Sequence, residues 1–284
     1  MPEVLTVDRL VKKYPKFELR EVSFGLEEGS VMGFIGRNGA GKTTTLKSLL
    51  GFVHPDSGEV KFFGKNFSED EMAIKQRIGF VSGGVNYYMN KKLKTIINVN
   101  KMFYNEWDEE ACRKYLDTFR LDTDKTPKQL SEGMKVKFAL LLALSHNAKI
   151  LLLDEPTSGL DPVSRDDLLD VFLDLARDQG ISILFSTHIT TDLEKCADYI
   201  TYIKDGGIVA SGKIGAFIDS YRLFRASPEQ LTPEIEARAV GIKRLREGVS
   251  LLLRTDDAYL GAGLAPLAVN LEEIMVHIEK EARI

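Results

Sequence analysis

A glycine-rich loop between an apolar strand and a helix constrains this chain more than any other feature. The loop reads GRNGAGKTT over residues 36–44, after the apolar run VMGFI and at the start of KTTTLKSLLGFV, which has helical spacing. A phosphate needs a concave row of backbone N–H groups, and Gly36, Gly39 and Gly41 permit one because glycine tolerates positive φ. The helix adds its positive N-terminal end. The alternative is a glycine-rich turn with an incidental lysine, which the strand-loop-helix order disfavours.

The side chains of this loop predict the remaining phosphate contacts. Lys42 is expected on the β- and γ-phosphates, Thr43 on Mg²⁺, and Thr44 beside the outer phosphates. The sequence therefore predicts a site for a nucleoside triphosphate with its metal ion.

Two carboxylates follow a second apolar strand, ILLLDEP at residues 150–156. Asp154, at the carboxyl end of the strand, is suited to orient Mg²⁺, a hard cation that prefers oxygen ligands. Glu155 could accept a proton from the water that attacks the γ-phosphate. Alone, two acids at a strand end are most simply solvated side chains, but beside a phosphate loop the catalytic interpretation is favoured.

His188 ends a third apolar strand, ILFSTH. Such a histidine is usually structural, but a strand parallel to the Asp154 strand delivers it to the edge where open α/β sheets bind ligands.

The stretch LSEGMKVK at residues 130–137 opens a long apolar helix. Ser131 is a common N-cap residue, so an ordinary helix start is one interpretation. The other is half of a phosphate site, in which the Ser131 hydroxyl, the Gly133 N–H and the helix dipole bind a nucleotide held by a second molecule.

The order of patterns predicts an α/β fold. An N-terminal β-rich part, helix-compatible sequence over about 85–145, and then alternating strands and helices imply a parallel sheet covered on both faces. After residue 222 the character changes, with a possible hairpin around Glu247 and Gly248 and a closing helix, LEEIMVHIEKEAR. We expect a main domain at 1–222 and an α+β accessory segment at 223–284.

Composition excludes several classes. The net charge of −4 argues against a general nucleic-acid binder, and Cys112 and Cys196 form no cluster that suggests a disulfide framework or a zinc site. No apolar run reaches the length of a membrane span, and MPEVLTVDRL lacks the blocks of a signal peptide. The chain is expected in the cytoplasm.

Together these motifs resemble the ATP-binding cassette (ABC) ATPases, a type of P-loop NTPase, over residues 3 to about 222. SGLD at 158–161 is similar to the family's D-loop, Tyr14 matches its adenine-stacking aromatic, and LSEGM stands where the family has its signature LSGGQ. The resemblance implies an N-terminal antiparallel β subdomain, a helical insertion, ATP and Mg²⁺ as ligands, and catalysis by Glu155 and His188. The residues it places on nucleotide or metal are Tyr14, Asn38, Gly39, Ala40, Gly41, Lys42, Thr43, Thr44, Ser131, Gly133, Asp154 and Asp161.

Two departures from the family pattern stand out. Glu132 and Met134 replace a glycine and a glutamine of the signature, and Gly83 stands at the place of the Q-loop glutamine. Glycine offers no side chain to Mg²⁺ or to the attacking water. Ser82 or Asn86 could compensate, although two adjacent glycines are typical of a plain loop. Slow hydrolysis or weakened coupling is therefore one expectation.

The resemblance implies a subunit that powers a separate integral membrane permease, pairs with a second ABC ATPase subunit as a homo- or heterodimer, and lies on the inner face of the cell membrane. The signature is similar to those of bacterial exporters of drugs, lipids or antimicrobial peptides. The alternatives are a soluble ABC ATPase without a transporter, and a regulator that binds ATP but hydrolyses it weakly.

Overall fold

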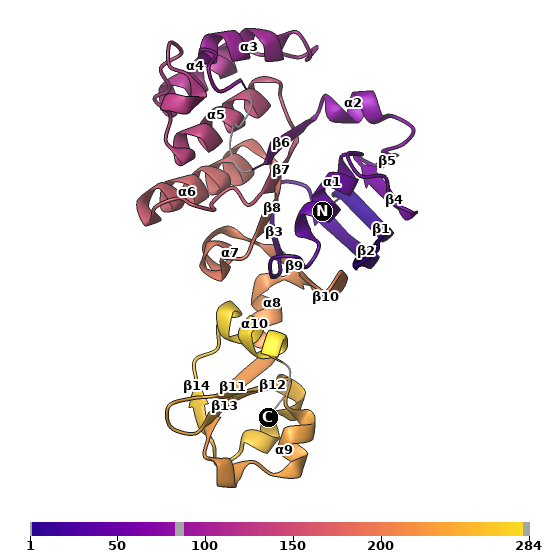
Figure 1. The fold of residues 1–284 in the computed structure, drawn as a ribbon, viewed down its shortest axis with the longest axis vertical. Helices are drawn as coiled ribbons and strands as arrows, with labels where there is room; N and C mark the ends of the chain where they lie inside the picture. The colour runs from indigo at the N-terminus through magenta and orange to yellow at the C-terminus, as the bar shows by residue number, and fades with distance from the viewer. Residues whose placement is uncertain (1, 83–87, 281–284) are drawn as a thin grey trace. The chain divides into compact units, whose positions relative to one another are not determined.

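The computed structural model describes residues 2–82 and 88–280. The chain divides into two compact units, residues 1–211 and 212–284, which are labelled by element in Figure 1. The second unit begins ahead of the boundary expected at residue 223, because the strand that spans this position, β11, pairs with β13 of the second unit.

The first unit opens with an antiparallel sheet of four strands in the order β2-β1-β4-β5. Burial alternates along the second half of β2, with one face on the core and one toward solvent, as antiparallel sheets allow. The expected N-terminal antiparallel β subdomain is confirmed. Its strands are β1 (Glu3–Tyr14), β2 (Phe17–Glu27), β4 (Ser57–Phe62) and β5 (Lys65–Asn66).

A six-stranded sheet in the order β10-β9-β3-β8-β7-β6 forms the centre of the first unit. Neighbours from β9 to β6 pair in parallel. Three of these strands are buried along their whole length, which explains their near-continuous apolar sequence. The strands are β3 (Val31–Ile35), β6 (Ile78–Ser82), β7 (Ile150–Asp154), β8 (Ser182–Thr187), β9 (Tyr199–Lys204) and β10 (Gly207–Lys213).

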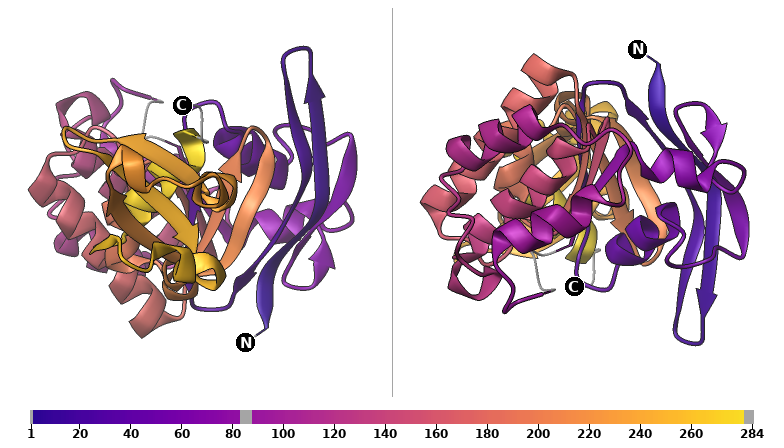
Figure 2. Two further views of the ribbon diagram at one scale, coloured as in Figure 1. Left: turned by 90° about the horizontal axis from the view of Figure 1, so that it is seen from below. Right: turned by 90° about the horizontal axis from the view of Figure 1, so that it is seen from above.

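Helices cover the central sheet of the first unit. Figure 2 shows the magenta and salmon helices α3 to α6 on one side and the antiparallel sheet on the other, with α1 beside the latter. Leu46 and Leu49 of α1 join one apolar core with residues of both sheets, including Leu5 and Leu152. The helices are α1 (Lys42–Leu49), α2 (Glu71–Lys75), α3 (Leu93–Lys101), α4 (Glu109–Thr118), the short η1 (Pro127–Gln129), α5 (Glu132–Ser145), α6 (Pro162–Gln179) and α7 (Thr190–Cys196).

The second unit has its own sheet, β12-β13-β11-β14, and its own apolar core. The predicted hairpin is confirmed, because β12 and β13 pair antiparallel on either side of Glu247 and Gly248. The predicted closing helix is α10 (Leu271–Lys280). The other elements are α8 (Ile214–Asp219), β11 (Tyr221–Ala226), η2 (Pro228–Gln230), α9 (Pro233–Arg238), β12 (Gly241–Arg244), β13 (Val249–Arg254), η3 (Thr255–Gly261) and β14 (Ala265–Leu267).

Among the helices of residues 2–82 and 88–280, none has the length and apolar character needed to span a membrane.

Candidate nucleotide site

The loop between β3 and α1 needs its glycines for two different reasons. Gly41 caps α1 with φ of 116°, a conformation that side chains strongly disfavour. A Cβ on Gly36 would lie 2.3 Å from the carbonyl oxygen of Ile203, so this position allows no side chain. Gly39 has φ of 84° and faces open space. The chain therefore keeps its backbone N–H groups free of covering side chains at this turn.

Lys42 is almost completely buried, with 5% of its surface exposed. Its Nζ donates to the carbonyl oxygen of Gly36 at 2.7 Å and lies 3.2 Å from Oε1 of Glu155. A buried ammonium requires such partners, because desolvation without them would be costly. The lysine of the loop and the second acid of ILLLDEP thus lie in direct contact.

Asp154 is buried at the carboxyl end of β7 and joins three elements. Its Oδ1 accepts hydrogen bonds from the Thr43 hydroxyl at 3.2 Å and from the Ser186 hydroxyl at 2.6 Å. The parallel register of β7 and β8 places Ser186 opposite Asp154. The two residues expected on Mg²⁺, Thr43 and Asp154, are therefore neighbours.

Glu155 lies between the lysine and the histidine. Its Oε2 is 2.9 Å from Nδ1 of His188, while its Oε1 contacts Lys42. Its backbone has φ of 50°, which is unusual for a non-glycine residue, and its N–H donates to Oγ of Ser186 at 3.0 Å. A side chain held between a cation and an imidazole from an uncommon backbone conformation is typical of a functional position.

These side chains share a hollow of about 610 Å³ in the first unit. The expected residues Asn38, Gly39, Gly41, Lys42, Thr43, Thr44, Glu155 and His188 line it, together with Lys16, Phe17, Arg37 and Ser158. Ala40 is buried beneath the loop. Tyr14 does not line the hollow, whereas Phe17 does. The ring centroids of Tyr14 and Phe17 are 6.5 Å apart. The adenine contact of Tyr14 stays a prediction.

The signature segment lies outside this lining. Ser131 caps α5, its hydroxyl accepting from the N–H of Met134 at 3.3 Å, and it is exposed. Glu132 pairs with the buried Lys135 at 2.6 Å. The structure therefore contains the hydrogen bond that the N-cap interpretation requires, and the Ser131 side chain is also accessible to solvent. The second interpretation, a half-site, stays a prediction.

Asp161, expected on nucleotide from the D-loop resemblance, is the N-cap of α6. It accepts from the N–H groups of Val163 and Ser164, and the hydrogen bonds from Ser164 lower the pKa of its carboxyl. It does not line the hollow. Gly83 and Asn86, invoked for the Q-loop, lie outside the described residues.

Sequence reasoning missed Ser186 and Phe17. Ser186 is one of three polar residues in β8, and the parallel register of β7 and β8 brings it to Asp154. Phe17 directly follows Lys16 and stands three residues after Tyr14 in a turn region, where sequence does not indicate which ring faces the loop. Its Cζ would lie 2.8 Å from a Cβ on Gly41, so it packs directly on the phosphate loop.

Comparisons with known proteins agree with this geometry. A family model described as ABC transporter matches residues 19–158. The bacitracin transport ATP-binding protein BcrA of Bacillus licheniformis is 32% identical over 74% of this chain and 69% of its own length. The lantibiotic transport ATP-binding protein SrtF of Streptococcus pyogenes is 32% identical over 72% of this chain and 89% of its own.

A solved structure, the ADP conformation of an ATP-binding cassette of an ABC transporter, superposes with a TM-score of 0.65 at 26% identity, covering 75% of this chain and 92% of its own. Fold and site together define a P-loop ATPase. The chain belongs to the ABC transporter family as an ATP-binding, ATP-hydrolysing subunit.

Proposed function

We propose that this chain is the motor of an ABC exporter: it binds ATP with Mg²⁺, pairs with a second cassette, and drives a separate membrane permease from the inner face of the membrane. The observation that carries the catalytic part is the contact chain Lys42–Glu155–His188 inside the hollow of the phosphate loop. The family resemblance of LSEGM and the two antimicrobial-peptide transport relatives support the exporter part.

The loop binds the triphosphate. Backbone N–H groups of Asn38, Gly39 and Gly41, which line the hollow, would face the phosphates, and Thr44 would add a hydroxyl at the start of α1. Lys42 exchanges its contact with Glu155 for the β- and γ-phosphates. The base packs near the tip of the first hairpin, on Tyr14 as predicted or on Phe17, which lines the hollow.

The residues at the metal position fit Mg²⁺. A threonine hydroxyl and a buried carboxylate lie 3.2 Å apart, and Mg²⁺ is typically held by one or two protein oxygens together with phosphates and waters. Thr43 and Asp154 would hold the ion, and Ser186 would keep Asp154 oriented. When bound, the ion would neutralise charge on the outer phosphates.

Hydrolysis then needs a base and a positioning group. Water attacks the γ-phosphorus, the bond to the bridging oxygen of ADP breaks, and the proton of the water passes to the Glu155 carboxylate. His188, 2.9 Å from Glu155, orients that carboxylate and reaches the γ-phosphate. Lys42 stays on the phosphates and stabilises the negative charge of the transition state.

A second cassette completes the site. Ser131 is exposed and Gly133 follows it at the start of α5, so both are available to the γ-phosphate of a nucleotide held by another molecule. Asp161 and its neighbours would line the same interface. Two cassettes in head-to-tail pairing would enclose two ATP molecules, and hydrolysis would release them.

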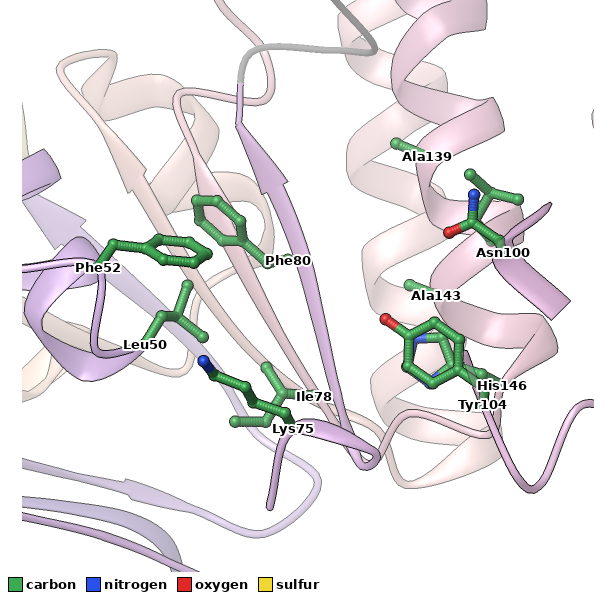
Figure 3. Close-up of a pocket in the computed structure, with 11 residues that line it drawn as sticks. Leu50, Phe52, Lys75, Ile78, Phe80, Asn100, Tyr104, Ala139, Ala143 and His146 are labelled. Atoms are coloured by element: carbon green, nitrogen blue, oxygen red, sulfur yellow. The ribbon is translucent and has the colours of Figure 1, made fainter. Parts of the chain in front are cut away.

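The permease docks on the groove between the central sheet and the helical segment. Figure 3 shows Phe52 and Phe80 close together on one side of β6, with Ala139 and Ala143 of α5 on the other, and all four line this groove, whose volume is about 240 Å³. Phe52 is 61% exposed, and Met102 and Phe103 at the end of α3 are 83% and 69% exposed. Exposed apolar side chains of this size around a hollow are typical of a protein interface.

A stacked ring pair forms one end of the groove. The rings of Tyr104 and His146 lie 3.7 Å apart and nearly parallel, and Nδ1 of His146 contacts the carbonyl oxygen of Gln76 at 3.2 Å. Burial lowers the pKa of His146 to about 4, so the imidazole is neutral at physiological pH. The permease therefore meets an apolar wall rather than a charge at this end.

Reconstitution tests the proposal. The full chain is captured from native membranes, the co-purifying integral protein is identified, and both are placed in vesicles with the cassette outside. We expect ATP-dependent uptake of a labelled peptide antibiotic into the lumen, which corresponds to export, and no uptake with Glu155→Gln. An ATPase that retains no integral protein and whose turnover is unaffected by membranes would instead support the soluble alternative.

A further inference from the structure

Three buried polar atoms lie unpaired close to the proposed catalytic pair. In the part of the chain that the structure describes, Oγ1 of Thr157, Nε of Arg165 and Oδ2 of Asp192 are buried and have no hydrogen-bond partner. Thr157 is fully buried and Asp192 is 2% exposed. Since buried polar groups are nearly always paired, three such atoms in one neighbourhood require an explanation.

The three residues come from the segments that carry Glu155 and His188. Thr157 lies in the turn directly after Glu155, and Arg165 is in the first turn of α6, which that turn leads into. Asp192 is in α7, which begins directly after the His188 segment and packs against α6. The charges of Arg165 and His188 both act on the Asp192 carboxyl, so the groups are close together.

Their chemistry is complementary. The carboxylate offers an acceptor, while the hydroxyl and the guanidinium offer donors. Burial raises the pKa of the Asp192 carboxyl, and the neighbouring Thr157 hydroxyl, followed by the charges of Arg165 and His188, opposes that rise. A buried polar group left unpaired has a free-energy cost, so a small movement that pairs all three would be favourable.

Such a movement would act on the catalytic pair. Nη2 of Arg165 also donates to the carbonyl oxygen of Leu160 at 3.4 Å, which ties the guanidinium to the turn after Glu155. The N–H of Ser158 donates to the Glu155 carbonyl oxygen at 3.2 Å, so the turn and Glu155 are linked through the backbone. Pulling Thr157 and Arg165 toward Asp192 would therefore adjust Glu155 against His188.

We propose that Asp192 is a positioning residue for ATP hydrolysis, which closes onto Thr157 and Arg165 and thereby fixes Glu155 relative to His188. The proposal rests on the roles given above to Glu155 and His188. None of Thr157, Arg165 and Asp192 lines the hollow of the phosphate loop. Asp192 thus acts on the rate of the chemical step and leaves the binding of ATP unchanged.

The test is steady-state ATPase kinetics of the full chain carrying Asp192→Asn, which keeps the shape and removes the charge. We expect kcat to fall about tenfold or more, as for loss of a charged hydrogen bond, while KM for ATP stays within about twofold. Asp192→Glu should recover part of kcat. Glu194→Gln removes an exposed carboxylate from the same helix and should leave both constants unchanged.

A purely structural role predicts a different result. It would lower the melting temperature and the folded fraction, with wild-type kcat per folded molecule, and that outcome overturns the proposal. If Asp192→Asn does not fold, Thr157→Val provides the second test. We expect the same fall in kcat for this variant, and an unchanged kcat would contradict the proposal. Glu155→Gln is measured alongside. Wild-type turnover of Glu155→Gln would refute the proposed catalytic role of Glu155. Loss of turnover in Glu155→Gln together with wild-type turnover of Asp192→Asn would refute only the role of Asp192.

Discussion

Two helix starts in the first unit, at α1 and at α5, both follow a motif with glycine and a hydroxyl, yet they are built differently. At α1, Gly41 has φ of 116° and Lys42 is buried with partners from its own chain. At α5, Gly133 has no positive φ, and a Cβ there would meet only ordinary contacts at 3.5 Å. Ser131 is exposed and has one capping bond.

The difference shows which motif is complete within the chain. The loop before α1 forms a hollow with Glu155 and His188, and Asp154 contacts its Thr43. Ser131 and Gly133, at the start of α5, do not line that hollow. A site that is fully assembled should respond to single substitutions in the isolated protein, whereas a half-site should respond only when two molecules meet.

The largest effect is expected at Glu155. Glu155→Gln keeps the size of the side chain but removes the proposed proton acceptor, so kcat for ATP should fall about 10²- to 10⁴-fold. ATP should still bind, and the trapped nucleotide should favour a paired form in gel filtration. Unchanged turnover would remove Glu155 from the mechanism.

Lys42→Ala should act on binding. The substitution removes the buried cation proposed to contact the outer phosphates, and we expect ATP affinity to fall about tenfold or more by calorimetry. Lys47→Ala is the matched control, because Lys47 is on the exposed side of the same helix. Near-native affinity of Lys42→Ala would show that the phosphates bind elsewhere.

Ser131→Ala separates the two interpretations of α5. Loss of the cap alone should cost about 0.5–2 kcal/mol of unfolding free energy and leave turnover of the folded protein unchanged. A half-site predicts normal ATP affinity of the monomer together with loss of ATP-driven pairing and a fall in turnover of about tenfold. Near-native turnover of Ser131→Ala would show that LSEGM is an ordinary helix start.

Mixing extends that prediction. Ser131→Ala and Lys42→Ala proteins are each deficient, but together they form one site with an intact loop and an intact signature. We expect partial recovery of ATPase activity in the mixture. The control is each variant mixed with itself at the same total concentration, where no recovery should occur.

The smallest effect on stability is expected from Gly133→Ala. Gly133 is helical and has room for a Cβ, so Gly133→Ala should stabilise the protein by about 0.5–1 kcal/mol. Gly41 has positive φ, and a Cβ there would lie 2.7 Å and 2.8 Å from Leu19 and Phe17, so Gly41→Ala should destabilise the protein. Thermal unfolding of both variants measures the contrast. If Gly133→Ala destabilised the chain as much as Gly41→Ala, the two helix starts would not differ as described.

Sequence predicted the parts of the site that depend on local order. The loop at 36–44, the acids at the end of β7 and the histidine at the end of β8 are each read from a short segment, and parallel strands bring their carboxyl ends to one edge. The fold class followed from the same alternation of strands and helices. The hairpin and the closing helix of the second unit were also predicted, because turn residues and helical spacing are local signals.

The remaining features depend on register and on tertiary packing. Ser186 reaches Asp154 only through strand pairing, and Phe17 rather than Tyr14 lines the hollow because of how the first hairpin folds over Gly41. The unpaired cluster around Asp192 requires α6 and α7 to be placed together. Residue spacing along the sequence does not determine these tertiary distances, so the contacts could not be predicted from the sequence.

The ion pair of Lys42 and Glu155 has a consequence for ligand discrimination. A ligand can free the buried ammonium from its carboxylate only if it supplies negative charge of its own at that depth, 3.2 Å from the Glu155 oxygen. Adenosine and AMP carry no charge to that position, whereas the β- and γ-phosphates do. The pair would therefore select nucleotides by the length of their phosphate chain, and Glu155, the proposed proton acceptor, would also contribute to ligand selection.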